Sequence, residues 1–357
     1  MRNGLGPLLG MVEPLPGWRA LSQGWRGTSR GALGCAWRWV LLAMLLVIAP
    51  QTWAGSDAAA LTPLRLMLAW QPQAQFAGYY VALEQGFYRE AGIELTILSA
   101  DRGRSALAAL RAGEVDLAVV WLAAAIRARA EGTPLVNVAQ LLPRSSVVLI
   151  ARVSSGVQRL SDLGGRRVGV WRGDAALPVE ALLRKQNLEV ERVPQSTTIN
   201  LFLRGGVEAM SGMLYNEYHL LIDAGPEPEA VMMFPLAAHG IDIPEDGLYV
   251  LEQTAHEQSA AIAAFVAATR RGWEQAFADP EQALDVVLRR QRAEYVPANR
   301  LHQRWMLEQI RAVMGEPGEN GWDWRLRRED VERVAELMQR LEMIDAVPSD
   351  IERLMLE

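Results

Sequence analysis

Four side chains with binding chemistry follow the apolar run at residues 64–69: Trp70, Gln75, Phe76 and Tyr79. Pro72 cannot donate a hydrogen bond to a sheet and disfavours helix in the residue before it, so a turn is expected here. In open α/β sheets, ligands lie at the carboxyl ends of the strands, beside the free N–H groups of the next helix. The pattern therefore predicts a place where a small planar molecule could be held.

A second candidate site is the turn that follows an apolar run ending at Trp171. Arg172 and Gly173 would offer a charge and open backbone N–H groups, and Asp174 would cap the next helix. An acidic cap competes with a bound anion for the same donors, so this turn favours a neutral or cationic ligand over a phosphorylated one. The alternative is that Asp174 only caps the helix and takes no part in binding.

A third candidate site consists of Tyr215, Asn216 and Glu217, which end a predicted strand and begin a helix. A carboxylate beside an amide and a phenol offers hydrogen-bond acceptors, a donor and a stacking face. The alternative is that Glu217 only stabilises the first turn of its helix through the helix dipole. Trp121 also ends an apolar run and precedes a helix, so we expect it at the edge of the same cleft.

Metal binding is not expected from the sequence. The four histidines, at positions 219, 239, 256 and 302, are scattered. No second histidine or acidic residue is expected at metal-ligand spacing from His219, so a structural role is favoured for it. Walker loops, dinucleotide fingerprints, nucleophile elbows and paired zinc motifs are absent from the sequence.

Short apolar strands alternate with alanine-rich helices in two blocks, which predicts two α/β lobes with parallel sheets and right-handed crossovers. The first block has expected strands at residues 64–69, 93–98, 115–120 and 135–141 and helices at 74–85, 104–112 and 122–131. The second block has expected strands at residues 168–171, 189–193 and 208–213 and helices at 175–187, 199–204 and 215–224. The extended segments 147–153 and 247–252 are expected to be the crossovers between the lobes, and residues 255–357 are expected to be helical.

These elements predict a division into a first lobe at residues 55–152, a second lobe at 153–246, and a final part at 247–357 that completes the first lobe and adds C-terminal helices. Residues 1–54 are basic and apolar and predict a cleaved secretory signal. Their apolar run at 40–49 is short of the roughly 20 residues that a membrane span needs. An N-terminal anchor and a start codon placed too early are the alternatives. Cys35 precedes the apolar run, where it is badly placed for lipid attachment.

The charge of the chain argues against nucleic acid and anionic lipid as partners. The formal net charge is −6, and the first 54 residues carry five arginines and one glutamate. Removal of this segment would leave a chain of formal charge about −10. It would also remove the single cysteine, so neither a disulfide nor a cysteine-ligated metal could contribute.

The stretch at residues 64–98 reads LRLMLAWQPQAQFAGYYVALEQGFYREAGIELTIL. It resembles the periplasmic binding proteins for thiamine pyrimidine precursors and sulfonates, and their enzyme relative, the fungal hydroxymethylpyrimidine phosphate synthase. The resemblance continues in the family's order through residues 113–118, 162–171 and 213–218 and reaches about residue 278. It implies an α/β fold of two lobes, the type II-like periplasmic-binding-protein fold, followed by a helical C-terminal segment. It also implies that Glu217 accepts hydrogen bonds from ring amino groups.

The resemblance to the synthase fails at the residues that would do its chemistry. As the resemblance implies, the synthase holds pyridoxal phosphate on a lysine, consumes a nearby histidine and uses a cysteine-rich run to handle iron. Gln85 and Phe76 stand at the lysine and histidine positions here, and the cysteine run is missing. A Schiff base requires a primary amine, and the only lysine, Lys185, is expected on the solvated face of a helix. A binding protein without a cofactor is therefore favoured over an enzyme.

The favoured interpretation is a secreted, monomeric solute-binding protein of the periplasm that delivers a small-molecule ligand to an ABC permease. The ligand implied by the resemblance is a thiamine pyrimidine precursor, with sulfonates, taurine and nitrate as alternatives. A sensory protein that partners a histidine kinase is the second interpretation, because the Tyr215-Asn216-Glu217 motif resembles the form joined to such kinases. A synthase-like enzyme is the third.

Overall fold

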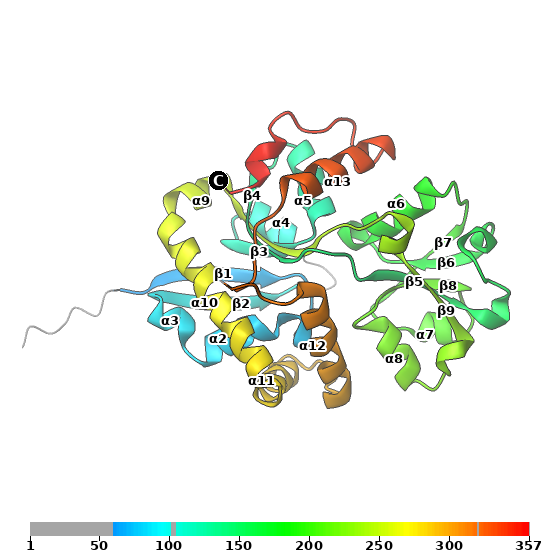
Figure 1. Cartoon of the computed structure of the whole chain (residues 1–357), viewed down its shortest axis with the longest axis horizontal. Coiled ribbons are helices and arrows are strands. Elements are labelled where there is room, and N and C mark those ends of the chain that lie inside the picture. The colour runs from blue at the N-terminus through cyan, green and yellow to red at the C-terminus, as the bar shows by residue number, and fades with distance from the viewer. Residues whose placement is uncertain (1–59, 101–104, 320, 357) are drawn as a thin grey trace, which may run out of the picture. The chain divides into compact units, whose positions relative to one another are not determined.

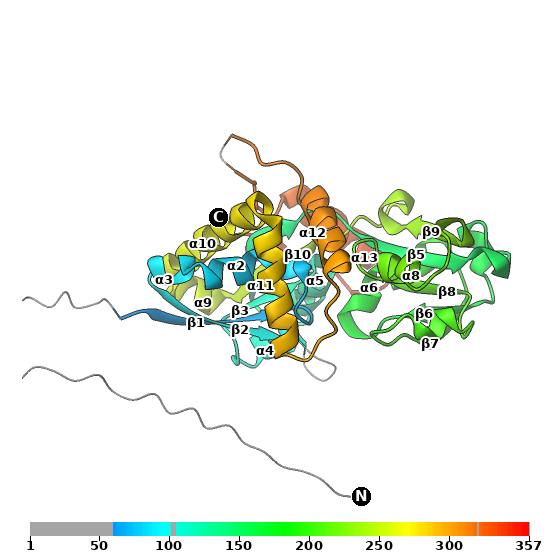
Figure 2. The ribbon, with the colours of Figure 1, turned by 90° about the horizontal axis from the view of Figure 1, so that it is seen from below.

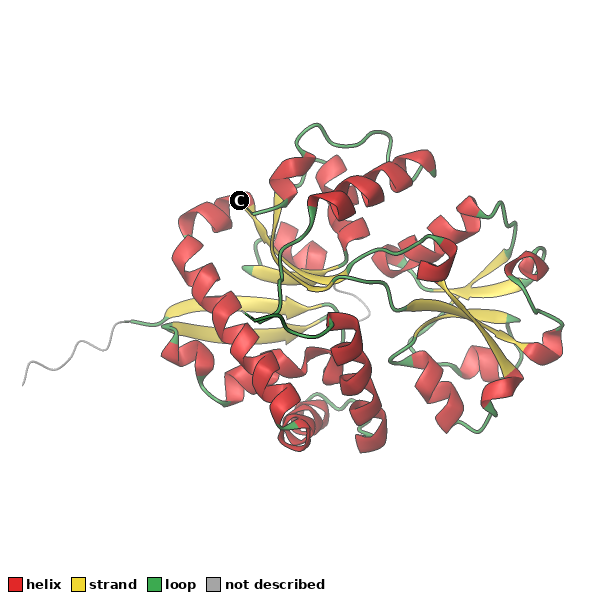
Figure 3. Cartoon of the chain, in the orientation of Figure 1, coloured by secondary structure: helices red, strands yellow, loops and turns green. Residues whose placement is uncertain are grey.

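The computed structural model describes residues 60–100, 105–319 and 321–356. Its strands form two five-stranded sheets with helices packed around them, and each sheet is the centre of one lobe (Figures 1 and 3). The expected secretory segment and Cys35 lie outside the described residues. Within these residues, no helix combines the length and the apolar character needed to cross a membrane.

The first sheet has the strand order β2-β1-β3-β10-β4. Its strands are β1 Thr62–Leu68, β2 Ile93–Ser99, β3 Leu117–Val120, β4 Leu135–Leu142 and β10 Glu245–Leu251. β1 runs parallel to β2 and β3, whereas β10 runs antiparallel to β3 and β4. All four residues of β3 and nearly all of β4 are buried, because helices cover both faces of the sheet.

The helices of the first lobe come from both ends of the chain. The early ones are η1 Ala74–Phe76, α2 Ala77–Glu84, α3 Phe87–Glu90, α4 Ala106–Arg111 and α5 Leu122–Ala130. The late ones are α9 Glu252–Glu257, α10 Ser259–Ala278, α11 Pro280–Ala293, α12 Arg300–Met314 and α13 Arg328–Arg340, followed by η7 Ile351–Leu354. In the view of Figure 1, α2 lies below β1 and β2, α10 crosses in front of them, and α4 and α5 lie above them. The expected helical ending is therefore confirmed, and much of it packs against the first lobe.

The second sheet has the strand order β7-β6-β8-β5-β9. Its strands are β5 Val147–Arg152, β6 Arg167–Val170, β7 Glu191–Pro194, β8 Ala209–Met213 and β9 Val231–Pro235. Its α-helices are α6 Leu177–Lys185, α7 Asn200–Leu203 and α8 Glu217–Asp223. Short 3-10 turns connect these elements: η2 Val153–Ser155, η3 Leu160–Leu163, η4 Gly173–Ala176, η5 Pro228–Ala230 and η6 Leu236–His239.

The expectation of purely parallel sheets is wrong, because both crossover segments are strands that run against their neighbours. Val147, at the start of β5, pairs with Met213 at the end of β8. Gly247, near the start of β10, pairs with Val120 at the end of β3. Each crossover strand thus begins beside the carboxyl ends of its neighbouring strands. It must therefore run antiparallel to them. β5 lies in the second sheet, although the expected division assigned its residues to the first lobe.

Helices α2 and α10 pack backbone against backbone in the first lobe (Figure 2). A Cβ atom added to Gly272 would lie 2.1 Å from the carbonyl oxygen of Gly78. One added to Gly78 would lie 2.3 Å from the ring of Trp273, which is 1% exposed. Only glycine at both positions allows the two helices to approach this closely.

The two crossovers are hydrogen-bonded to each other. Glu245 is 1% exposed, and its Oε1 accepts from the backbone N–H of Ser146 at 2.7 Å and from the hydroxyl of Ser145 at 3.0 Å. Asp242 accepts from the backbone N–H of Ser145 at 2.9 Å and pairs with Arg144 at 2.6 Å. Oε2 of Glu245 has no hydrogen-bond partner among the described residues. A buried carboxyl group therefore joins the segments that link the lobes.

We predict that this carboxyl group makes the stability of the protein depend on pH. Burial raises the pKa of Glu245 to about 8, and hydrogen bonds from Ser146 only partly oppose this. The folded protein therefore keeps a proton that the unfolded chain releases above its ordinary pKa of about 4.3. Stability from this group is fully present below that value and is lost as the pH rises through 8.

Glu245→Gln keeps the shape without the titration, so it should gain about 4 kcal/mol in free energy of unfolding relative to the parent between pH 5 and pH 8.5. Urea unfolding at a series of pH values measures this difference. The exposed Glu257→Gln serves as the control and should follow the parent. Equal pH profiles for the parent and Glu245→Gln would contradict the prediction.

Candidate functional site

The loop after β1, where the first candidate residues lie, is held by helices from the other end of the chain. The carbonyl oxygen of Pro72 accepts from Nε2 of Gln291 in α11 at 3.0 Å. The backbone N–H of Ala74 donates to Oε1 of Gln303 in α12 at 2.7 Å. The loop is thus fixed at the carboxyl end of β1, with η1 and α2 directly after it.

The side chains of Gln75 and Trp121 meet at the carboxylate of Asp246. Nε2 of Gln75 donates to Oδ2 at 2.5 Å, and Nε1 of Trp121 donates to Oδ1 at 3.0 Å. Asp246 is 3% exposed and has a φ of 44°, in the left-handed region that residues other than glycine rarely adopt. Such strained positions gather at functional sites. Asp246 is therefore the centre of the candidate site.

Tyr215 brings the second lobe to this group. It is 2% exposed and follows the carboxyl end of β8. Burial raises its pKa well above the ordinary value, and the charges of Asp246 and Glu245 raise it further, while a hydrogen bond with the side chain of Gln75 acts in the opposite direction. The hydroxyl group of Tyr215 thus lies beside groups from the first lobe.

Tyr79 lies close to the same carboxylate, since the charge of Asp246 contributes to the rise of its pKa, after burial and the nearby Tyr88. It is 1% exposed, and its ring meets that of Trp273 edge to face at 6.3 Å. Its hydroxyl group has no hydrogen-bond partner among the described residues. We refer to Gln75, Tyr79, Trp121, Tyr215 and Asp246 as the Asp246 cluster.

The Asp246 cluster has the chemistry of a recognition site for N–H donors. Burial raises the pKa of Asp246 to about 6, and the hydrogen bonds from Gln75 and Trp121 oppose this. The carboxylate is therefore largely ionised at neutral pH and accepts charge-assisted hydrogen bonds. Three aromatic residues, Tyr79, Trp121 and Tyr215, belong to the same cluster. A flat ring with amino groups could donate hydrogen bonds to the carboxylate and stack on the aromatic side chains.

Sequence reasoning selected Gln75, Tyr79, Trp121 and Tyr215 but missed Asp246. The residue precedes Gly247 at the start of the second crossover strand. Its position directly before a glycine, at a place where the chain returns to the first sheet, is a signal that could have drawn attention to it. Its contact with Trp121 joins residues 125 positions apart and is visible only in the fold.

Glu217 is turned back onto its own strand. It is 8% exposed, and its Oε2 accepts from the backbone N–H of Met213 at 2.8 Å. Its Oε1 accepts from Nδ2 of Asn216 at 3.0 Å. Burial raises its pKa to about 7, against the effect of these hydrogen bonds. The carboxylate is thus used within the second lobe, and a contact with a ligand remains a prediction.

Asn216 leads to a histidine pair at the contact between the lobes. Its Oδ1 lies 2.9 Å from Nε2 of His302 in α12. Nδ1 of His302 lies 3.1 Å from Nδ1 of His219 in α8, which lies 3.3 Å from Oδ2 of Asp223. The expectation that His219 lacks such a partner is wrong. Asp223 is four residues further on the same helix and could have been found by spacing, whereas His302 arrives only through folding.

The expected helix cap at Asp174 is also wrong. The chain forms the 3-10 turn η4 with Arg172 at its N-cap, and α6 begins only at Leu177. Asp174 lies inside this turn, and its carboxylate pairs with Arg127 of α5. Arg172 and Gly173 are exposed. The negative charge of Asp174 is therefore compensated by a residue of the first lobe.

The two remaining candidate residues differ in exposure. Phe76 is completely buried in the core of the first lobe. Trp70 is partly buried and packs against the same core. Their expected contacts with a ligand remain predictions.

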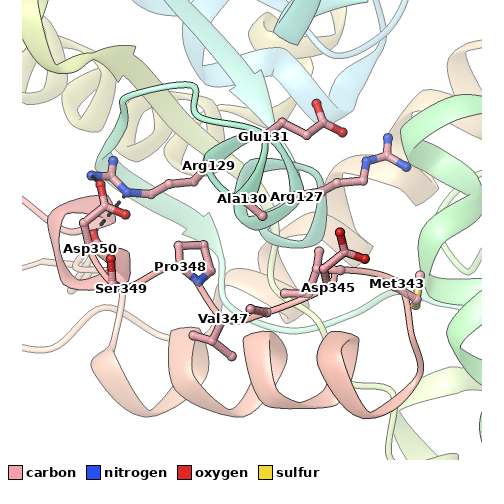
Figure 4. A pocket seen from close by; sticks show the side chains of 12 residues that line it. Arg127, Arg129, Ala130, Glu131, Met343, Asp345, Val347, Pro348, Ser349 and Asp350 are labelled. Atoms are coloured by element: carbon pink, nitrogen blue, oxygen red, sulfur yellow. Dashed lines mark hydrogen bonds and ion pairs between the residues drawn. The ribbon is translucent and has the colours of Figure 1, made fainter.

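Two cavities lie outside the Asp246 cluster. One of about 320 Å³ is lined by Gln71, Glu294, Val296 and residues 97–100, and it lies at the carboxyl ends of β1 and β2. The other, of about 650 Å³, lies between α5 and residues 343–350 (Figure 4). The smaller cavity borders the loop after β1, where ligands of open α/β sheets are expected.

The larger cavity is a weaker candidate because its arginines are already paired. The side chain of Arg129 is 1% exposed and pairs with Glu252 at 2.6 Å and with Asp350 at 2.7 Å. Arg127, which also lines this cavity, pairs with Asp174. The pair of Arg129 with Asp350 joins the C-terminal segment to α5.

Comparison with known proteins gives relatives that cover most of the chain. A formylaminopyrimidine-binding protein of Halalkalibacterium halodurans is 27% identical over 267 residues, which cover 71% of this chain and 78% of that protein. The riboflavin-binding protein RibY of Chloroflexus aurantiacus is 25% identical over 293 residues, which cover 76% of this chain and 80% of that protein. Both are named as binding proteins.

Solved structures give the fold. The crystal structure of the periplasmic aliphatic sulphonate binding protein SsuA from Escherichia coli matches with a TM-score of 0.62 at 16% sequence identity. The match covers 82% of this chain and 97% of that one. The chain therefore has the expected two-lobe periplasmic-binding-protein fold with a helical C-terminal segment. The model of the family described as NMT1/THI5 like matches residues 73–283, more than half of the chain, so this protein belongs to the NMT1/THI5-like family.

Proposed function

We propose that this protein is the solute-binding component of a periplasmic ABC importer and that it captures a thiamine pyrimidine precursor. The observation that carries this proposal is the buried carboxylate of Asp246. It accepts N–H groups from Gln75 and Trp121 of the first lobe, and Tyr215 of the second lobe lies beside it. An aminopyrimidine offers the same kind of N–H donor on a flat ring.

The ligand would take over part of the hydrogen bonding within the Asp246 cluster. An amino group can replace the N–H of Gln75 at Asp246, and the released amide can then bond to a ring nitrogen. The ring would lie against aromatic side chains, at about 0.5–1.5 kcal/mol per stacked pair beyond burial. Contacts to residues of both lobes would stabilise the form in which the lobes meet.

An anionic ligand fits this cluster less well. Asp246 and Glu217 both accept hydrogen bonds, and a sulfonate or nitrate would face carboxylates instead of donors. Among the described residues that line the smaller cavity at the carboxyl ends of β1 and β2, the ionisable one is Glu294, which is also acidic. These features favour a neutral or amino-bearing heterocycle.

Catalysis of the synthase type is not part of the proposal. Lys185 is exposed on α6, and its Nζ donates to the carbonyl oxygen of Gly240 at 3.2 Å. Gln85 and Phe76 replace the lysine and histidine that the synthase chemistry requires.

The relatives that span most of the chain are named for binding. Delivery to a permease is therefore favoured over partnership with a sensor kinase.

A thermal-shift screen tests the ligand class. The panel contains formylaminopyrimidine, riboflavin, an alkanesulfonate, taurine and nitrate. Binding of the native state raises the midpoint of unfolding in proportion to the logarithm of ligand concentration. We expect the pyrimidine to raise the Tm and the anions to leave it unchanged. A rise with the sulfonate or nitrate and none with the pyrimidine would refute the proposed ligand.

We predict that Asp246→Asn weakens binding of the aminopyrimidine by about 1.5–3 kcal/mol, because it removes a charge-assisted acceptor while keeping the shape. Calorimetry of the parent and the variant measures this change. Asp174→Asn is the matched control, since its carboxylate pairs with Arg127, and it should bind within about 0.5 kcal/mol of the parent. If the two variants bind equally well, Asp246 does not contact the ligand.

We further predict different effects for two substitutions of Trp121. Trp121→Ala removes both the ring and the N–H to Asp246 and should weaken binding by about 1–3 kcal/mol. Trp121→Phe keeps an aromatic face and leaves one acceptor of Asp246 open to the ligand, so most of the affinity should remain. Calorimetry at one pH, with circular dichroism to check folding, compares the three proteins. Full affinity in folded Trp121→Ala would place this ring outside the binding site.

A further inference from the structure

The contact between the lobes brings together three side chains with metal-ligand chemistry. His219 and Asp223 lie one turn apart on α8 of the second lobe, and His302 lies in the first turn of α12, which packs against the first lobe (Figure 1). One ligand atom of each residue lies within 4.8 Å of those of the other two. His302 is 4% exposed, whereas the side chains of His219 and Asp223 are 19% and 38% exposed.

The hydrogen bonds around His302 define which ring nitrogen carries its proton. Nδ2 of Asn216 donates to Glu217, so Oδ1 of Asn216 is free to accept. Its neighbour, Nε2 of His302, must then be the donor, at 2.9 Å. The neutral ring therefore presents a lone pair at Nδ1, because a neutral imidazole carries one hydrogen. A hydrogen bond to the far nitrogen is also how metal-binding histidines are oriented.

The atoms around Nδ1 of His219 do not have enough hydrogens to form a hydrogen bond at each contact. This nitrogen lies 3.1 Å from Nδ1 of His302 and 3.3 Å from Oδ2 of Asp223. Both of these atoms are acceptors, and a neutral His219 has at most one hydrogen at Nδ1 to share between them. Nδ1 of His219, Nδ1 of His302 and Oδ2 of Asp223 thus bring three lone pairs together. A cation can bind all three lone pairs, whereas one proton cannot.

We propose that His219, Asp223 and His302 form a Zn²⁺ site that joins the two lobes. Zn²⁺ bonds imidazole nitrogen and carboxylate oxygen at about 2.0–2.2 Å, so two ligand atoms of a tetrahedral site lie about 3.4 Å apart. The separations of 3.1 Å and 3.3 Å are close to this value. Three protein ligands leave a fourth position, which the exposure of Asp223 opens to water.

Neighbouring residues would hold this site in shape. The ring of Trp305 packs against His219 with the ring centres 5.1 Å apart, and its Nε1 lies 3.4 Å from the carbonyl oxygen of Leu214. A metal that takes ligands from both lobes binds only the arrangement in which the lobes meet, and it therefore stabilises that arrangement. The inference concerns the metal alone and does not rest on the proposed ligand.

Calorimetry with ZnCl₂ tests the site on the full chain, prepared without a histidine tag and freed of metal by a chelator. We expect one Zn²⁺ per chain with a Kd below about 10 µM, and a rise in Tm on addition of the metal. His302→Gln and Asp223→Asn should each weaken binding at least about 10-fold. His256→Gln, which removes an exposed histidine outside the cluster, should bind like the parent.

Co²⁺ gives a second measurement, because a tetrahedral site with nitrogen ligands produces a visible absorption that Zn²⁺ then abolishes by displacement. Asp223→Asn decides the matter if His302→Gln fails to fold, since Asp223 is partly exposed. The absence of stoichiometric Zn²⁺ binding by the parent would overturn the proposal. So would folded variants at positions 223 and 302 that bind Zn²⁺ as tightly as the parent.

Discussion

The structure depends on the burial of two adjacent carboxyl groups, Glu245 and Asp246, at the point where the chain returns from the second sheet to the first. Glu245 joins the two crossovers through Ser145 and Ser146. Asp246 collects side chains that follow β1 and β3. A buried carboxyl group that loses its hydrogen-bond partners costs about 1–3 kcal/mol, and more where it is charged, as at Asp246. The N–H and O–H donors around these carboxyl groups must therefore stay in place, which fixes the loop after β1, the end of β3 and the crossovers relative to one another.

The same arrangement explains why several contacts between the lobes are polar. The parallel strands of both sheets end where the crossovers begin, and strand ends expose loops and helix starts instead of apolar faces. His302 with Asn216 and Tyr215 with Gln75 lie at such positions, and Arg127 of α5 pairs with Asp174 in the turn η4. Polar contacts can be exchanged for water or ligand at small net cost.

Much of the fold could be predicted from the sequence because alternating apolar runs report burial directly. The strands and helices of both blocks lie within a few residues of their expected positions, as β1 at Thr62–Leu68 and α5 at Leu122–Ala130 illustrate. The directions of β5 and β10 could not be predicted in this way, since an apolar run carries no information about which end enters a sheet. β9 was missed because Pro228 and Pro235 frame a short run that resembles a loop.

The candidate site was predicted only in part, because the sequence shows where strands end but not which distant side chains meet. Positions at strand ends select Gln75, Trp121 and Tyr215, and the structure brings these three residues together with Asp246. Spacing along the chain cannot show that Glu217 bonds to its own strand or that Arg127 compensates Asp174. Nor can it show His302 beside His219, since 83 residues separate them. Such pairs arise from tertiary packing alone.

The close approach of Gly78 and Gly272 has a consequence for the order in which the chain folds. The second sheet is built from one continuous stretch of chain, whereas the first sheet and α2 require β10 and α10 from far along the sequence. Contacts between distant segments form slowly, because a long loop must close before they contribute. The second lobe can therefore fold first as a unit, while the N-terminal strands stay incomplete until α10 is available.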